Sequence, residues 1–102
     1  MKIYQEYKFI LFDEEILNSF LQLLVKNEKL SEKTIKQYYN SIVDFDLYLI
    51  FVYSNWDYIK DSDFELFSKM LKRMSVTNRG IKTRISQVKR FKKYYDVNKI
   101  KR

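Results

Sequence analysis

The sequence predicts an all-α fold, a compact bundle of four or five helices in a single domain. The 102 residues contain one Gly and no Pro, whereas sheets built from hairpins usually place these residues at their turns. Apolar residues recur at spacings of three and four in four successive segments, which is the period of an amphipathic helix. Eight Phe and nine Tyr supply large apolar side chains for one core, so a disordered chain is excluded.

The first helix is expected over residues 13–27. Asp13, Glu14 and Glu15 place carboxylates where a helix N-terminus has free N–H groups and the positive end of its dipole. The apolar residues that would face the core are Ile16, Leu17, Phe20, Leu21 and Leu24. Residues 1–12 follow neither the period of a strand nor that of a helix, so this N-terminal extension is given no structure.

The second helix is expected to begin at Ser31 and to run toward Tyr53, which makes it the longest. Residues 54–57 then interrupt the periodicity, and Trp56 among them is expected to fill a corner of the bundle. The third helix should begin within residues 61–63, with Ser62 and Glu65 as a capping box. Its buried stripe would comprise Phe64, Phe67, Met70, Leu71 and Met74.

The fourth helix follows a polar break, and Thr77 is expected to cap it. Its single apolar edge would comprise Ile81, Ile85, Val88, Phe91 or Lys92, and Tyr95. The opposite arc carries cations and short hydrogen-bonding side chains, namely Lys82, Thr83, Ser86, Lys89, Arg90 and Lys93.

The positive charge of the chain is concentrated at its C-terminal end. Residues 79–102 hold ten Lys and Arg against the single acidic residue Asp96, a net charge of +9, whereas residues 1–78 carry a net charge of −2. Such asymmetry predicts a polyanionic partner.

Composition also excludes several kinds of chemistry. With no Cys and no His, the chain cannot form disulfides, thiol nucleophiles, imidazole bases or the usual zinc sites, so we expect no cofactor, metal or catalytic residue. Five aspartates could suggest a metal site, but we expect them to lie at helix starts or on solvated faces instead. They are Asp44, Asp46, Asp57, Asp61 and Asp63. No apolar run approaches the length of a membrane span and no signal peptide is seen, so we expect a cytoplasmic protein.

Three segments occur in a recognisable order. Leu30, Ser31, Thr34 and Ile35 form an L-S-x-x-T-I connector that precedes Tyr38 or Tyr39 and then Phe45. Residues 59–64 lead into the third helix, and residues 80–95 read GIKTRISQVKRFKKYY. In this order they resemble the N-terminal core-binding domain, also described as SAM-like, of tyrosine recombinases and phage integrases. Gly80 departs from the pattern, since the family often has Thr or Ser there.

The resemblance implies a four- or five-helix module over residues 13–95 that closes one half of a clamp around double-stranded DNA. Its second and fourth helices would cross the major groove, and further copies of the recombinase would share the DNA. Residues 96–102 would then be a basic tail or the start of a linker to a catalytic domain. None of the family's catalytic residues maps onto this chain, so we expect no enzyme activity from it alone, no small-molecule substrate and no membrane partner.

Ten residues are predicted to contact DNA, because phosphates and base edges require cations and hydrogen-bond donors. They are Lys33, Thr34 and Gln37 on the second helix, and Arg79, Lys82, Thr83, Ser86, Lys89, Arg90 and Lys93 on the fourth. The alternatives are a solvated face for the cations, helix capping at the second helix, and bonds from Thr83 and Ser86 to carbonyls four residues earlier. An aromatic stripe is interpreted as core rather than as a stacking surface for single strands, and comprises Tyr38, Tyr39, Phe45, Phe64, Phe67 and Tyr95.

Two other functions remain open. The bundle could be a protein–protein interaction module that uses exposed aromatics of residues 1–12, in which case Glu substitutions at Lys89 and Arg90 would leave partner binding intact. It could also be a small DNA-binding regulator with a helix-turn-helix, although residues 74–80 join helices too long for a compact reader and no dimerisation helix follows.

Overall fold

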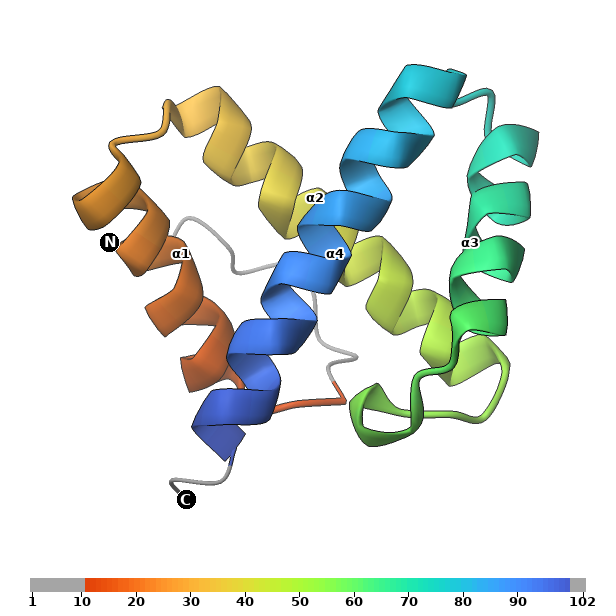
Figure 1. The fold of residues 1–102 in the computed structure, drawn as a ribbon, viewed down its shortest axis with the longest axis horizontal. Helices are drawn as coiled ribbons and strands as arrows, with labels where there is room; N and C mark the ends of the chain where they lie inside the picture. The colour runs from red at the N-terminus through yellow and green to blue at the C-terminus, as the bar shows by residue number, and fades with distance from the viewer. Residues whose placement is uncertain (1–10, 100–102) are drawn as a thin grey trace.

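The computed structural model describes residues 11–99, and within this range the chain forms α-helices, one short 3₁₀ helix and no strand (Figure 1). The elements are α1 (Glu14–Glu28), α2 (Glu32–Phe51), η1 (Trp56–Tyr58), α3 (Asp61–Arg73) and α4 (Asn78–Lys99). Helix α4 crosses in front of α2, with α1 on one side and α3 on the other, and it contacts all three (Figure 1). The predicted all-α bundle is confirmed.

Three helices begin where their capping residues predict. The Asp13 carboxylate accepts a hydrogen bond from the Glu15 N–H at 2.8 Å, and the Ser31 hydroxyl accepts from the Thr34 N–H at 3.2 Å. At the start of α4, the Gly80 N–H donates to the Thr77 hydroxyl at 3.1 Å. Each side chain therefore satisfies one of the backbone donors that a helix start leaves without an internal partner.

The start of α3 differs from the prediction. Lys60 is the N-cap residue, and its N–H donates to Asp63 Oδ2 at 2.8 Å, so the capping carboxylate is Asp63 and not Glu65. The Tyr48 hydroxyl of α2 donates to the other oxygen of Asp63 at 2.9 Å. This tertiary hydrogen bond fixes the Asp63 side chain over the helix start, which sequence spacing alone does not show.

Helix ends account for two further differences. Helix α3 ends at Arg73, so Met74 becomes its C-cap and is 56% exposed rather than buried. Helix α2 ends at Phe51, two residues before Tyr53, whose φ of 56° is incompatible with a continuing helix. With 20 residues it is therefore not the longest helix as predicted, because α4 has 22. Helix α4 includes residues 96–99, whereas residues 1–10 and 100–102 of the expected extension and tail lie outside the described residues.

Aromatic side chains fill the centre of the bundle. Phe20, Phe45, Phe67 and Phe91 are fully buried, as is Trp56, whose ring centroid lies 5.4 Å from that of Phe45 and 5.2 Å from that of Phe91. Trp56, which was expected at a corner of the bundle, thus packs in the core between α2 and α4. The aromatic stripe is core as well, because Tyr38, Phe45, Phe67 and Tyr95 are buried and Tyr39 and Phe64 pack against them.

One aspartate is buried in that core, contrary to the prediction of a helix start or a solvated face. Asp46 is fully buried on α2, and its Oδ1 accepts hydrogen bonds from Trp56 Nε1 at 2.7 Å and from the Leu11 N–H at 3.1 Å. Donors from η1 and from the chain before α1 offset the cost of burying the carboxylate.

Among residues 11–99, no helix is both long and apolar enough to cross a membrane.

Candidate nucleic-acid interface

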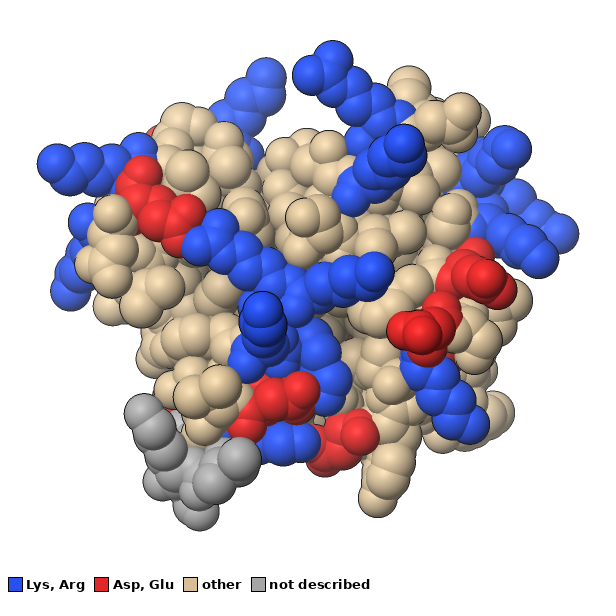
Figure 2. Space-filling view, viewed as in Figure 1, with Lys and Arg blue, Asp and Glu red and all other residues tan. Residues whose placement is uncertain are grey.

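Lys and Arg side chains gather over α4, across the middle of the face that Figure 2 shows. Some of these cations are neutralised within the protein. Arg84 pairs with Asp44 at 2.5 Å, Lys92 with Asp96 at 2.6 Å, and Lys99 with Asp57 at 2.5 Å. The hydrogen bond from Lys99 holds the pKa of Asp57 below its ordinary value, so this pair is charged at neutral pH.

Four other cations of α4, Arg79, Lys82, Lys89 and Lys93, are exposed and make no ion pair with any described residue. Together with Ser86 they follow one another at spacings of three or four, so they form a single line along the helix. At 1.5 Å per residue this line is about 21 Å long. We call it the α4 stripe, and its members are Arg79, Lys82, Ser86, Lys89 and Lys93.

Lys89 of the α4 stripe contacts an aromatic ring of α3. Its ammonium nitrogen lies 5.0 Å from the centre of the Phe64 ring, a distance typical of a cation–π contact. The aliphatic part of the side chain can pack on apolar surface while the charge stays in water. The contact orders the side chain without neutralising it, so Lys89 remains available to an anion.

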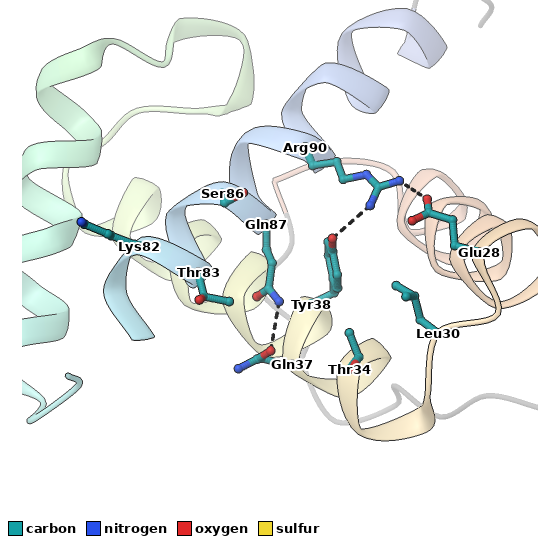
Figure 3. Close-up of a pocket in the computed structure, with 10 residues that line it drawn as sticks. All are labelled: Glu28, Leu30, Thr34, Gln37, Tyr38, Lys82, Thr83, Ser86, Gln87 and Arg90. Carbon is teal, nitrogen blue, oxygen red and sulfur yellow. Dashed lines mark hydrogen bonds and ion pairs between the residues drawn. The ribbon is translucent and has the colours of Figure 1, made fainter. Parts of the chain in front are cut away.

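Arg90 differs from the α4 stripe because its guanidinium is bound on two sides. Nη1 donates to the Tyr38 hydroxyl at 3.1 Å, and Nη2 pairs with Glu28 (Figure 3). Burial raises the pKa of Tyr38 above its ordinary value, so its hydroxyl is neutral at neutral pH. Arg90 thus ties α4 to both α1 and α2, and its predicted contact with DNA competes with this role.

An open groove of about 480 Å³ lies between the first half of α2 and α4 (Figure 3). It is lined by Glu28, Leu30, Thr34, Gln37, Tyr38, Lys82, Thr83, Ser86, Gln87 and Arg90. We call it the α2–α4 groove. Six of the ten predicted contact residues meet here, namely Thr34, Gln37, Lys82, Thr83, Ser86 and Arg90.

The other four predicted residues do not line the α2–α4 groove. Lys89 and Lys93 border a second hollow of about 380 Å³ farther along α4, together with Arg90, Lys92 and Asp96. Lys33 and Arg79 are exposed in the first turns of α2 and α4 and line neither hollow. The fold therefore places one row of cations beside one groove with polar walls.

The hydroxyl groups of the groove have local partners as well. The Thr34 hydroxyl lies 3.0 Å from that of Ser31, and the Thr83 hydroxyl donates to the Arg79 carbonyl at 3.0 Å. The second contact is the local alternative considered for Thr83. No hydrogen bond joins the exposed Ser86 side chain to another described residue.

Sequence reasoning missed two buried polar residues at the groove, Gln87 in its wall and Ser41, which does not line it. Gln87 is 5% exposed and Ser41 is fully buried, and the Ser41 hydroxyl donates to Gln87 Oε1 at 2.7 Å. Gln87 Nε2 in turn donates to Gln37 Oε1 at 3.1 Å. Gln87 precedes the core residue Phe91 by four positions, as Ser41 precedes Phe45, and this shared face was a signal that both are buried.

The site thus offers positive charge, amides and hydroxyls. Among residues 11–99, no three His, Cys, Asp or Glu side chains are grouped as metal ligands would be.

When the sequence is compared with known protein families, residues 17–96 match the phage integrase N-terminal SAM-like domain. Neither the curated proteins nor the solved structures contain a significant match to the chain.

Proposed function

The chain belongs to the family of phage integrase N-terminal SAM-like domains, and from this membership and the α4 stripe we propose that it is a double-stranded DNA-binding module of a site-specific tyrosine recombinase. It grips a recombination half-site through α2 and α4. It does not cleave DNA on its own, and it orients a separate catalytic domain on the half-site. Further copies of the recombinase occupy the same DNA.

The observation that carries this proposal is the distribution of unpaired charge on α4. An ion-paired Lys or Arg must give up its carboxylate to bind a phosphate, whereas a solvated one only exchanges water and releases counterions from the DNA. The α4 stripe contains the solvated cations Arg79, Lys82, Lys89 and Lys93. Its length of about 21 Å corresponds to about six phosphates along one strand.

The α2–α4 groove supplies the second part of the proposed interface. With the four cations of the α4 stripe along the phosphates, the residues Gln37, Thr34 and Ser86, which line the groove, would approach the base edges. Lys33 adds a cation at the start of α2. Phosphate contacts of this kind position a protein on the duplex, and contacts with base edges provide specificity.

Charge reversal within the α4 stripe tests the proposal. The variant Lys82→Glu/Lys89→Glu/Lys93→Glu should bind a fluorescent 20-bp duplex about 100-fold more weakly at 50 mM salt, as measured by fluorescence anisotropy. If about five cations reach phosphates, the wild-type log–log salt slope should be roughly −4 to −5, and the variant's should be shallower by about 3.

The matched control reverses three exposed lysines on α1 and α3, Lys26, Lys69 and Lys72, none of which is in an ion pair with a described residue. Its net charge is the same, yet it should lose less than about 5-fold in affinity, because only long-range attraction is reduced. Equal losses in the two variants would contradict the proposed surface. Absence of wild-type binding at tens of micromolar protein and low salt would contradict the function.

A further inference from the structure

A chain of three hydrogen-bonding side chains leads from the core to the floor of the α2–α4 groove. It begins at the buried Ser41 of α2, passes through the buried amide of Gln87 on α4, and ends at the exposed Gln37 on α2. We call it the Ser41–Gln87–Gln37 relay. Its two contacts, at 2.7 Å and 3.1 Å, have ordinary hydrogen-bond lengths.

The relay has a direction. Ser41 donates its proton to Gln87 Oε1, so the Gln87 amide nitrogen must point the other way, toward Gln37. Gln37 accepts through its oxygen, and Figure 3 shows its nitrogen turned away from Gln87. An amide at a protein surface ordinarily rotates between two orientations, and the bond from Gln87 selects one of them.

We propose that Gln87 is a positioning residue that presents the Gln37 amide nitrogen to bound DNA, so that Gln37 reads the N7 acceptor of a purine. The inference rests on the proposed function, since it assigns a specificity to the groove of that same DNA-binding module. In the major groove the acceptors are purine N7, guanine O6 and thymine O4, and the donors are the amino groups of adenine and cytosine.

The usual pairing of glutamine with adenine uses both ends of the amide, the oxygen on the N6 amino group and the nitrogen on N7. In the relay the Gln37 oxygen is already bonded to Gln87. Gln37 is therefore biased toward a contact made by its nitrogen alone. A single such contact should discriminate between base pairs by about 5-fold, less than a bidentate contact achieves.

The first experiment locates the base pair that Gln37 reads. The wild-type chain and the Gln37→Ala variant are each used to select duplexes from a randomised library. The base pair of interest is the one that the wild type enriches and the Gln37→Ala variant does not. A duplex with a 7-deazapurine at that pair lacks the N7 acceptor, and a duplex with an N4- or N6-methylated base has its amino group blocked. The wild type should lose about 5-fold in affinity for the first duplex and little for the second.

The second experiment reverses the relay. In Gln87→Glu the carboxylate has no N–H to donate, so Gln37 must turn its nitrogen inward and expose its oxygen. The preference should then reverse, so that the blocked amino group weakens binding and the loss of N7 does not. A residue with a purely structural role would not exchange one preference for the other.

If circular dichroism shows that the buried carboxylate of Gln87→Glu prevents folding, Gln87→Met is used in its place. It removes both hydrogen bonds at similar volume, and it should abolish the preference as completely as Gln37→Ala does. Lys89→Gln is the matched control, because it should lower affinity and the salt slope while leaving the preference intact.

Three results would overturn the inference. They are a wild type that does not depend on N7 at the selected pair, a Gln87→Met variant with an unchanged preference, and selected pools without any position that depends on Gln37. If the wild type binds duplexes with the salt slope given above but shows one of these results, the relay proposal fails and the DNA-binding proposal stands. If no duplex is bound, the proposed function fails with it.

Discussion

Tyr48 shows how a single buried side chain makes the stability of the fold depend on pH. Its hydroxyl donates to Asp63, and burial together with this hydrogen bond and the negative charge of Asp63 raises the pKa of Tyr48 to about 12. The fold therefore favours the neutral phenol over the phenolate. Burial raises the pKa values of Tyr38 and Tyr95 in the same direction.

We predict that the free energy of unfolding falls above pH 10. A raised pKa in the folded state stabilises the fold fully below the unfolded value of about 10, and this contribution is lost as the pH rises toward 12. For Tyr48 the loss should be roughly 2–3 kcal/mol. Urea unfolding followed by circular dichroism between pH 8 and pH 12 measures it.

Tyr48→Phe should flatten this pH dependence and cost about 1 kcal/mol at pH 8, because Asp63 loses a hydrogen bond. Tyr53→Phe is the control, since Tyr53 is 98% exposed and its removal should change neither quantity. A Tyr48→Phe variant with the wild-type slope above pH 10 would show that other groups cause the loss.

At the scale of elements, the last residue of α1 affects the charge that α4 presents. Glu28 pairs with Arg90 at one wall of the α2–α4 groove, and the two side chains are 32% and 43% exposed. This ion pair joins α1 to α4, but it also places a carboxylate where a phosphate would approach. Because the pair is partly solvated, its contribution to stability should be small.

Glu28→Gln should therefore bind DNA about 3- to 10-fold more tightly, since a repulsive charge is removed and the Arg90 charge is no longer neutralised. The free energy of unfolding should fall by no more than about 1 kcal/mol. Anisotropy titrations at one salt concentration measure the first quantity, and urea unfolding the second.

Glu65→Gln is the matched control. Glu65 is exposed on α3, and the substitution removes the same charge at a position outside the groove. Its affinity should change by less than about 2-fold. Unchanged or weaker DNA binding by Glu28→Gln would contradict the position of the interface.

At the scale of the whole molecule, local pattern predicted the elements well. Asp13, Ser31 and Thr77 mark helix starts because their partners lie two or three residues away, within reach of the local backbone. The burial of Asp46 could not be predicted in this way, because its donor Trp56 is brought to it only by the turn through η1. The cap of α3 by Asp63 is local, but the second hydrogen bond to that carboxylate comes from Tyr48, which lies on another helix.

The candidate site was predictable only in part, for the same reason. The cationic arc of α4 follows from spacing alone, and six of the ten predicted residues line one groove. Which cations are neutralised depends on long-range pairs such as Arg84 with Asp44 and Arg90 with Glu28. The burial of Gln87 and Ser41 had a local signal in their spacing from Phe91 and Phe45, but the hydrogen bond between them was missed because it joins α4 to α2.

In the proposed complex, the unpaired cations of α4 and the groove beside them face duplex DNA. The most direct test is a titration of the ¹⁵N-labelled chain with a 20-bp duplex, followed by the amide shifts of every residue. The largest shifts are predicted for residues 79–93 of α4 and 33–41 of α2, and they should diminish as salt is added. Largest shifts on α3, or near the exposed Phe51 and Tyr53 at the far end of α2, would contradict the account.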